Sequence, residues 1–254
     1  SSGVYRLSHG IDIKKVSIIG NPTGSYSYNE NTNAYTCLIL DSEIENVDIL
    51  YTSNRNDRVV IKNIMIKSNS CVFSKNSATF IENTPKNEFD LTISKQNVNG
   101  LNLSKSVNIF VENVYITGCS GYGIDTGTIN YINNVITTNC NIGFKVNKDG
   151  RITNPYSSGN NIGFEIYGSN NNINNIWCDQ IIKYGIYINS QNNVDNLMIT
   201  GNLDQIGYCG VYNNANLNNS KFDMIMGRVS QYYAGITYNN TPESDRDKNC
   251  AFYN

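Results

Sequence analysis

The sequence has little charge, a single histidine and no long apolar run, and each shortage excludes a class of protein. Charged residues make up 16% of the 254, and 19 Lys and Arg against 21 Asp and Glu give a net charge of −2. No basic segment could hold a phosphate backbone, so nucleic acid is not an expected partner. No apolar run approaches the roughly 18 to 20 residues that span a bilayer, and residues 1–10 lack a signal-peptide pattern, so we expect no membrane insertion.

Metal ligands are also scarce. The seven cysteines form no CxxC pair, and only His9 could join them as a nitrogen ligand. The sequence therefore predicts no metal site and no resident cofactor. Cysteines within apolar stretches are typical of small buried hydrophobic residues. Cys119 and Cys140 are 21 residues apart and are expected on adjacent coils, where a disulfide is possible but stacked free thiols are more common.

What the chain does have is Asn, together with 20 Gly and 18 Tyr but only 4 Pro. Asn and Gly favour turns, so long helices are not expected. From about residue 110 a segment of the form Gly-hydrophobe-x-hydrophobe recurs at intervals of 20 to 25 residues. Its glycines are Gly123, Gly143, Gly163, Gly185, Gly210 and Gly235.

A second series of short segments runs in step with the first. It includes residues 113–116, 134–135, 154–155, 175–177, 196–199 and 221–224. Both series alternate apolar with polar residues, which is the period of a strand. Two strands in each repeat predict an all-β parallel β-helix, in which inward side chains of successive coils stack into one core. A leucine-rich repeat would need Leu at fixed places and a helical half, and neither is present.

Asn recurs at one place in the second series, at positions 113, 134, 154, 175 and 196. Asn accepts the left-handed conformation that a corner requires. Its amide can also bond the Asn of the next coil, about 4.8 Å away. We therefore expect an Asn ladder along the solenoid.

The chain is interpreted as a single domain, residues 1–254. Residues 1–110 have strand segments at irregular intervals, with loop excursions expected at 21–34 and 70–88. Regular coils are expected over 110–240, and a terminal loop over 241–254.

The opening segments resemble the first coils of pectate-lyase-like right-handed β-helices, the group that includes bacteriophage tailspikes and capsule depolymerases. The matching residues are 3–8 (GVYRLS), 11–13 (IDI) and 16–21 (VSIIGN). The resemblance implies a right-handed solenoid that binds a bacterial surface polysaccharide and cleaves it by hydrolysis or β-elimination, often as a homotrimer on a virion tail. The usual capping segment before this opening is absent, so a fragment of a longer protein is expected. The paired-Asp and Gly-His-Gly motifs of polygalacturonases are absent too.

Residues one repeat apart are expected to be vertical neighbours, which brings two carboxylates together. Asp179 and Asp204 each lie six positions before a repeat glycine, and each is followed by a glutamine, Gln180 or Gln205. A separation of about 5 Å suits the acid and nucleophile of a retaining glycosidase. The alternative is two solvated turn residues out of register.

A second candidate set occupies the outward positions of the glycine strands. Its members are Asp125, Lys145, Glu165, Tyr187 and Tyr212. Asp125 and Glu165 would lie about 9.6 Å apart, near the upper limit for an inverting pair. Lys145 between them favours a neutral surface ladder instead. The two tyrosines are candidates for stacking on sugar rings.

One large apolar residue per coil is also expected on the outer face of the other sheet. The stripe comprises Tyr115, Ile136, Tyr156, Trp177, Met198 and Ile225. Exposed apolar patches of this kind are usually covered. A homotrimer interface, a carbohydrate platform using Trp177, and a covering loop are the alternatives, and a one-residue shift would place the stripe in the core.

These observations predict a tailspike-like protein that binds and depolymerises a bacterial surface polysaccharide, with Asp179 and Asp204 as the first-choice pair and Asp125 and Glu165 as the second. A binding module without turnover is one alternative. A polysaccharide lyase, for which Ca²⁺ is a possible cofactor, is the other. Arg151 is a candidate for holding an acidic sugar or starting an elimination.

Overall fold

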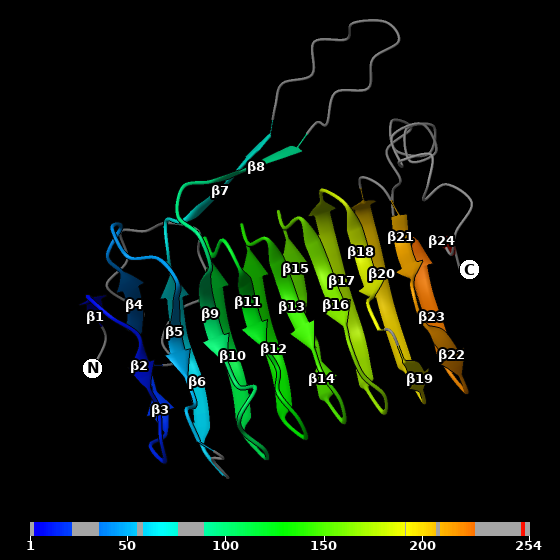
Figure 1. Ribbon diagram of the computed structural model, residues 1–254, viewed down its shortest axis with the longest axis horizontal. Helices are drawn as coiled ribbons and strands as arrows, with labels where there is room; N and C mark the ends of the chain where they lie inside the picture. Colours follow the sequence, from blue (N-terminus) through cyan, green and yellow to red (C-terminus); the bar gives the residue numbers. More distant parts are fainter. Residues whose placement is uncertain are drawn as a thin grey trace, which may run out of the picture.

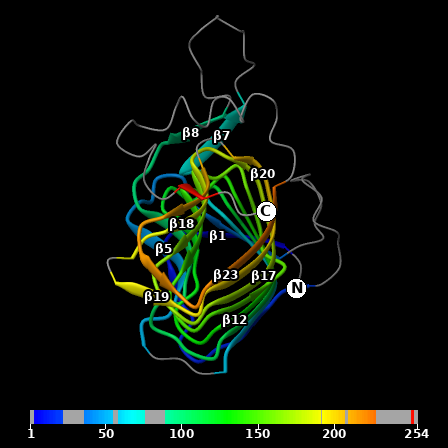
Figure 2. The ribbon, with the colours of Figure 1, turned by 90° about the vertical axis from the view of Figure 1, so that its right-hand side faces the viewer.

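The computed structural model describes residues 3–21, 36–54, 58–75, 89–190, 192–206, 209–226 and 250–251. These residues form an all-β protein with two long parallel sheets and no helix. The chain alternates between the sheets, so strands adjacent in one sheet are usually one coil apart in sequence (Figures 1 and 2). A parallel β-helix fits this arrangement, as the repeat predicted.

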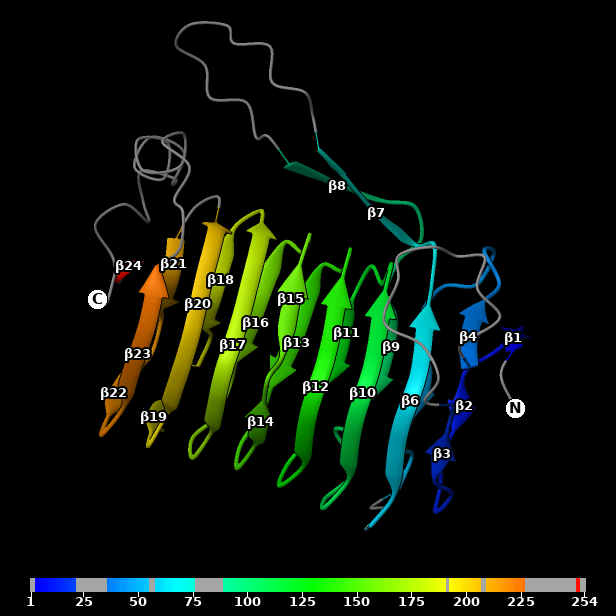
Figure 3. The same cartoon turned by 180° about the vertical axis from the view of Figure 1, so that it is seen from behind.

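The larger sheet, here called sheet A, has eleven strands. They are β1 (Gly3–Leu7), β3 (Ile18–Ile19), β4 (Thr36–Leu40), β6 (Val60–Lys67), β10 (Phe110–Thr117), β12 (Tyr131–Thr138), β14 (Arg151–Thr153), β15 (Tyr156–Ser158), β17 (Asn172–Ile181), β20 (Met198–Ile206) and β23 (Lys221–Met226). Figure 3 shows β6 to β23 side by side. Pro155, which has no N–H to donate, separates β14 from β15.

The second sheet, sheet B, has nine strands. They are β2 (Ile11–Asp12), β5 (Val47–Tyr51), β9 (Val98–Asn102), β11 (Tyr122–Asp125), β13 (Ile142–Val146), β16 (Ile162–Ile166), β18 (Tyr184–Ile188), β21 (Cys209–Asn213) and β24 (Cys250–Ala251). A small parallel pair, β19 (Asn193–Asp195) and β22 (Asn216–Asn218), lies at a corner.

The core lies between sheets A and B, and its side chains stack in columns. Ile124, Phe144, Phe164 and Ile186 are register neighbours on sheet B, and none is exposed. The rings of Phe144 and Phe164 stack with centroids 4.5 Å apart. Because apolar residues stack on successive coils, the inward-facing positions form one continuous core.

The Asn ladder is present, although it is divided between two corners. Asn134 donates to Asn113 at 2.7 Å and Asn175 donates to Asn154 at 2.8 Å, and all four residues have φ between 51° and 55°. The placement of Asn196 in this ladder is wrong. It donates instead to Asn170, at 2.9 Å, at a second left-handed corner, because the coil before it is longer.

The described part of the expected excursion at 70–88 belongs to a hairpin. Strand β7 (Cys71–Lys75) pairs antiparallel with β8 (Phe89–Ile93), and the hairpin projects from the body (Figures 1 and 3). Phe73 and Leu91 pack on Ile182, several coils further along. Cys71, Val72 and Phe73 form a short apolar run that is typical of a strand, and the polar residues after it concealed this signal. The rest of that excursion, most of 21–34, and nearly all of 241–254 lie outside the described residues.

Candidate functional site

Asp179 and Asp204 are register neighbours on the adjacent strands β17 and β20. Neighbouring strands lie about 4.8 Å apart, so the predicted adjacency is confirmed. Both side chains point away from the core, since the preceding residues Cys178 and Leu203 are fully buried. The arrangement provides two half-buried carboxylates at a spacing suited to an acid and a nucleophile.

The polar surroundings of the two carboxylates differ. Gln205 Nε2 donates to Asp179 Oδ1 at 3.2 Å. Asp204 Oδ1 is buried and has no hydrogen-bond partner among the residues that the structure describes. Gln180 and Gln205 both adopt left-handed φ, 55° and 52°, where the strands turn the corner. The two glutamines therefore form the corner of the coil, and Gln205 also donates a hydrogen bond to Asp179.

The negative charge of Asp179 affects the thiol beside it. Burial, and then the charge of Asp179, raise the pKa of Cys178 well above 9.0. The thiol of Cys178 faces the core and donates to the Gly185 carbonyl at 3.7 Å. Cys178 is thus an inert neighbour of the site and not a nucleophile.

An aromatic column runs beside the carboxylate pair on the outer face of sheet A. Trp177 is 52% exposed and lies two positions before Asp179 on the same face. Tyr156, its register neighbour, packs edge-on with ring centroids 6.3 Å apart. The column continues through Ile136 to Tyr115, whose hydroxyl lies 2.9 Å from Thr138 Oγ1.

The placement of Met198 in this column is wrong. The coil that joins β17 to β20 is longer than the coil before it, so the register neighbour of Trp177 is Asn202, 25 residues on, and not Met198, 21 residues on. Asn202 is in turn the neighbour of Ile225. The register also shifts by one residue between Ile173 and Ile176. Met198 pairs with Asn172 at the opposite end of the strands and is 46% exposed there. Gly201, with φ 140°, sits opposite Ile176 at the shift. An inserted residue of this kind changes the face on which a side chain lies.

Arg151 is not brought to the carboxylate pair. Its guanidinium lies 5.7 Å from the ring centroid of Tyr131, and it pairs in register with Asn172. This is again the opposite end of sheet A from Asp179. An elimination in which Arg151 acts beside the two aspartates is therefore not supported.

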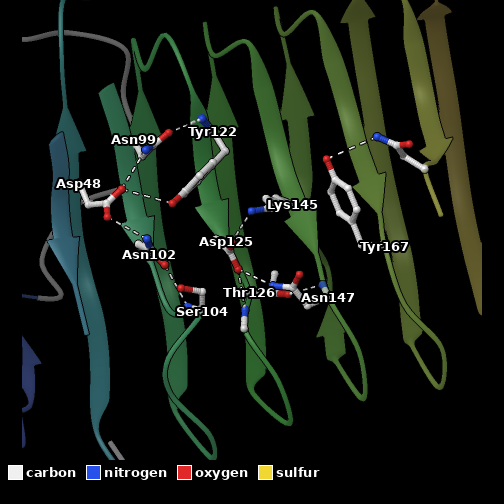
Figure 4. Close-up of polar contacts among 12 residues, drawn as sticks. Asp48, Asn99, Asn102, Ser104, Tyr122, Asp125, Thr126, Lys145, Asn147 and Tyr167 are labelled. Carbon is white, nitrogen blue, oxygen red and sulfur yellow. Dashed lines mark hydrogen bonds and ion pairs between the residues drawn. The ribbon is translucent and has the colours of Figure 1, made fainter. Parts of the chain in front are cut away.

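The second predicted set is in register across sheet B. Asp125, Lys145, Glu165, Tyr187 and Tyr212 occupy successive strands. Lys145 Nζ pairs with Asp125 Oδ2 at 2.9 Å and lies 5.2 Å and 5.7 Å from the ring centroids of Tyr122 and Tyr167 (Figure 4).

Although they face outward, the two acids of this set are covered by their neighbours. Asp125 is 1% exposed and Glu165 is 5% exposed. Asp125 also accepts a hydrogen bond from Asn147, at 2.5 Å. Its neighbours therefore fix Asp125 as the centre of a buried polar network.

Several polar residues of this face were missed from the sequence. Asp48 accepts hydrogen bonds from Asn99 and Asn102, both at 2.8 Å, and from the Tyr122 hydroxyl at 3.2 Å (Figure 4). Polar and apolar residues alternate over 46–49, and this pattern indicates that the Asp48 side chain lies on the outer face. Its partners were hidden because Asn99 lies 51 residues further along, beyond the hairpin.

The tyrosine hydroxyls of this face are held protonated. Burial, reinforced by the charges of Asp48 and Asp125, raises the pKa of Tyr122. Burial, followed by the hydrogen bond and charge of Glu165, raises the pKa of Tyr167. Both hydroxyls therefore serve as hydrogen-bond donors on an acidic face.

Neither face gathers a metal-binding cluster. Within the described ranges, no group of three or more His, Cys, Asp or Glu could hold a metal ion. The same ranges contain no helix long and apolar enough to cross a membrane.

Comparison with solved structures agrees with the class that the strands define, an all-β protein built on long parallel sheets. The catalytic domain of a GH87 α-1,3-glucanase in complex with nigerose matches with a TM-score of 0.50 and 13% sequence identity, over 91% of this chain and 50% of that domain. ORF18 of Geobacillus virus E2 matches with a TM-score of 0.38 and 15% identity, over 89% of this chain and 52% of that one. This chain thus spans about half the length of each. Identities this low show likeness of fold alone.

No protein-family model and no curated protein matches the sequence.

Proposed function

We propose that the chain is a closed right-handed β-helix that binds a bacterial surface polysaccharide and hydrolyses its glycosidic bonds. The observation that carries the proposal is the register pair Asp179 and Asp204 beside the half-exposed Trp177. Aromatic rings stack on the apolar faces of sugars, and paired carboxylates cleave the bond between them. The α-1,3-glucanase of similar fold carries nigerose, so α-1,3-glucan belongs among the first substrates to assay.

The roles within the pair follow from their contacts. Asp179 accepts the Gln205 amide, which stabilises a carboxylate, so we assign it as the nucleophile. Asp204 has no such donor at its buried Oδ1 among the described residues, so we assign Asp204 as the acid of the pair. Asp204 gives its proton to the leaving oxygen while Asp179 bonds to the anomeric carbon. Water, deprotonated by Asp204, then releases the sugar with retention at that carbon.

Release of reducing ends from purified capsular polysaccharide, teichoic acid or α-1,3-glucan tests the proposal. Asp179→Asn and Asp204→Asn should each lose at least about a hundredfold in rate, since each removes a group that reacts in the transition state. Asp223→Asn is the matched control, because Asp223 is an exposed carboxylate on the neighbouring strand β23. Unchanged release by both variants would remove the site.

Two other results would assign the chain to the alternatives. Binding without product in every substrate would make it a glycan-binding module. An unsaturated product that absorbs in the ultraviolet and is lost on chelation would make it a Ca²⁺-dependent lyase. Location on a virion tail, as in tailspikes, is part of the same proposal and is tested by immunolabelling of particles.

A further inference from the structure

A ladder of stacked side chains lies on the outer face of sheet A, at the end of the strands away from the Asp179–Asp204 pair. Phe110, Tyr131 and Arg151 are register neighbours on the adjacent strands β10, β12 and β14, which Figure 3 shows side by side. The rings of Phe110 and Tyr131 stack with centroids 4.9 Å apart and 6° between their planes. The guanidinium carbon of Arg151 lies 5.7 Å from the Tyr131 ring centroid. A guanidinium stacks favourably on an aromatic ring, so the rings limit the orientations that Arg151 adopts.

This ladder is open to solvent. Phe110 is 46% exposed, and Ile129, at the corner two residues before Tyr131, is 43% exposed. Arg151 is exposed as well, whereas Ile152, the next residue of its strand, is buried in the core. Exposed apolar side chains that gather at one place mark interaction sites. A ligand can therefore reach both the cation and the apolar surface beside it.

Arg151 has no acidic partner. It forms no ion pair and donates no hydrogen bond to any residue that the structure describes. The acids that flank the ladder along the chain have other partners, since Glu112 accepts the Asn133 amide at 3.4 Å and Asp149 accepts the Asn170 amide at 3.0 Å. A guanidinium carries five N–H donors in a planar fork that matches a carboxylate or a phosphate. The fork of Arg151 is thus available to an oxyanion.

Two further cations lie at the corner beside this ladder. Backbone hydrogen bonds link Arg58 to Asn108, Asn108 to Ile129 and Ile129 to Lys148 on successive coils. Arg58 and Lys148 therefore share one corner, and Lys148 lies three residues before Arg151. Both residues are exposed, and neither forms an ion pair with a described residue. In a chain whose net charge is −2, these unpaired cations create a local positive field.

We propose that Arg151, oriented by the Phe110–Tyr131 stack, is the centre of a second glycan-binding site that takes an acidic polysaccharide. A carboxylate or phosphodiester group of the glycan binds the Arg151 fork, and further acidic groups meet Lys148 and Arg58. Arg58 precedes β6 and Lys148 precedes β14, three coils further along, so the site suits a polymer with repeated acidic groups.

This inference rests on the proposed function for its class of ligand, a glycan, but not on the Asp179–Asp204 pair. Binding at Arg151 would hold the polysaccharide to the molecule between cleavage events.

Isothermal titration calorimetry with three oligomers tests the site: a galacturonate hexamer, a glycerol-phosphate hexamer and an α-1,3-glucose hexamer. The Asp179→Asn variant provides the background, so that no cleavage contributes heat. At least one acidic oligomer should bind, and more weakly as salt is added. Arg151→Gln should weaken that binding about tenfold or more, the value of one charge-assisted hydrogen bond, and leave the glucose hexamer unaffected. The acidic oligomer that binds more tightly identifies the anionic group.

Further variants test the fork and the stack separately. Arg151→Lys keeps the charge but not the planar fork, so it should recover only part of the affinity. Tyr131→Ala removes the stacked ring and should weaken binding about threefold, whereas Tyr131→Phe keeps the ring and should bind like the background. Arg6→Gln is the matched control, because Arg6 is an exposed arginine on β1, at the end of the same sheet.

Trp177 separates this test from that of the proposed function. It is the one tryptophan of the sequence and lies two residues before Asp179, so its fluorescence reports the carboxylate pair. Arg151→Gln should reduce the calorimetric affinity and leave the release of reducing ends from short oligomers unchanged. Failure of the proposed function would instead appear as a silent Trp177 and no reducing ends, with the binding that depends on Arg151 retained.

Near-ultraviolet circular dichroism shows whether each variant keeps its packing. Because Arg151 is exposed, Arg151→Gln should leave the spectrum unchanged, so its affinity decides the test. Equal affinities for Arg151→Gln and the background, an equal loss in Arg6→Gln, or no binding of either acidic oligomer would overturn the site. An oligothymidylate that binds as tightly as the acidic glycans would contradict the assignment to a glycan.

Discussion

Asn supports this structure through its backbone and its side chain together. Asn134 has φ 51°, and its amide donates to Asn113 Oδ1 at 2.7 Å. The left-handed conformation is expensive for most residues and accessible to Asn. An Asn at a corner therefore bends the chain and links one coil to the next.

Replacing Asn134 separates these two contributions. Asn134→Ala should lower the free energy of unfolding by about 2 kcal/mol, from left-handed strain and one lost hydrogen bond. Asn134→Gly should lose about 1 kcal/mol, since glycine adopts this φ without strain. Urea denaturation measures both, and equal losses for Ala and Gly would contradict a conformational role.

The buried thiols predict how stability depends on pH. Burial raises the pKa of Cys71 from 9.0 to about 12, and burial raises that of Cys178 well above 9.0. Above pH 9 the unfolded thiols lose protons that the folded thiols keep, so the unfolded state is favoured. The free energy of unfolding should fall from about pH 9 towards pH 12, with a slope of up to about 1.4 kcal/mol per pH unit for each thiol. Cys178→Ala should have the shallower slope, and an identical slope would contradict the assignment.

At the scale of elements, a glycine column lets the coils of sheet B pack closely. A Cβ on Gly163 would meet the carbonyl oxygen of Gly185 at 2.5 Å and the Cys178 sulfur at 2.8 Å. Gly123, Gly143 and Gly185 each have the same relation to the next glycine carbonyl. The repeat glycine that marked each coil in the sequence is thus required by the spacing between coils.

Substituting one of these glycines tests the column. Gly163→Ala should lower the free energy of unfolding by about 2 to 3 kcal/mol, because backbone and a buried sulfur must move. Gly150→Ala is the control, since its Cβ would meet only a side-chain oxygen of Asn171 at 2.9 Å and nothing else closer than 3.9 Å. Thermal unfolding of the two variants should differ, and equal losses would contradict the column.

The repeat period in the sequence was enough to predict which residues are register neighbours in regular coils. It did not predict neighbours where residues are inserted between coils. The register of Asp179 and Asp204 was predicted correctly because each lies six positions before the glycine of its own repeat. Met198 was misplaced because 25 residues separate Trp177 from its register neighbour Asn202, whereas 21 separate Tyr156 from Trp177. Asp48 and its partners were missed because the β7–β8 hairpin interrupts the repeat. Side-chain burial, as at Asp125 and Glu165, depends on neighbouring coils that no single period reveals.

At the scale of the whole molecule, the aromatic column of sheet A exposes Trp177 and Ile225 to 52% and 68%. Large exposed apolar surfaces favour association. We expect a homotrimer in which neighbouring copies cover part of the column. Light scattering should give about three times the chain mass of 28.4 kDa. The mass of a single chain would contradict the trimer and leave the whole column for the glycan.

The most direct test of the account is the emission of Trp177 during titration with the polysaccharide that the chain cleaves. A glycan that stacks beside Asp179 and Asp204 should change the emission saturably, both in the wild type and in Asp204→Asn, while the variant releases no reducing ends. Polysaccharide that binds and is cleaved with no change in Trp177 emission would contradict the account, because cleavage would then occur elsewhere on the molecule.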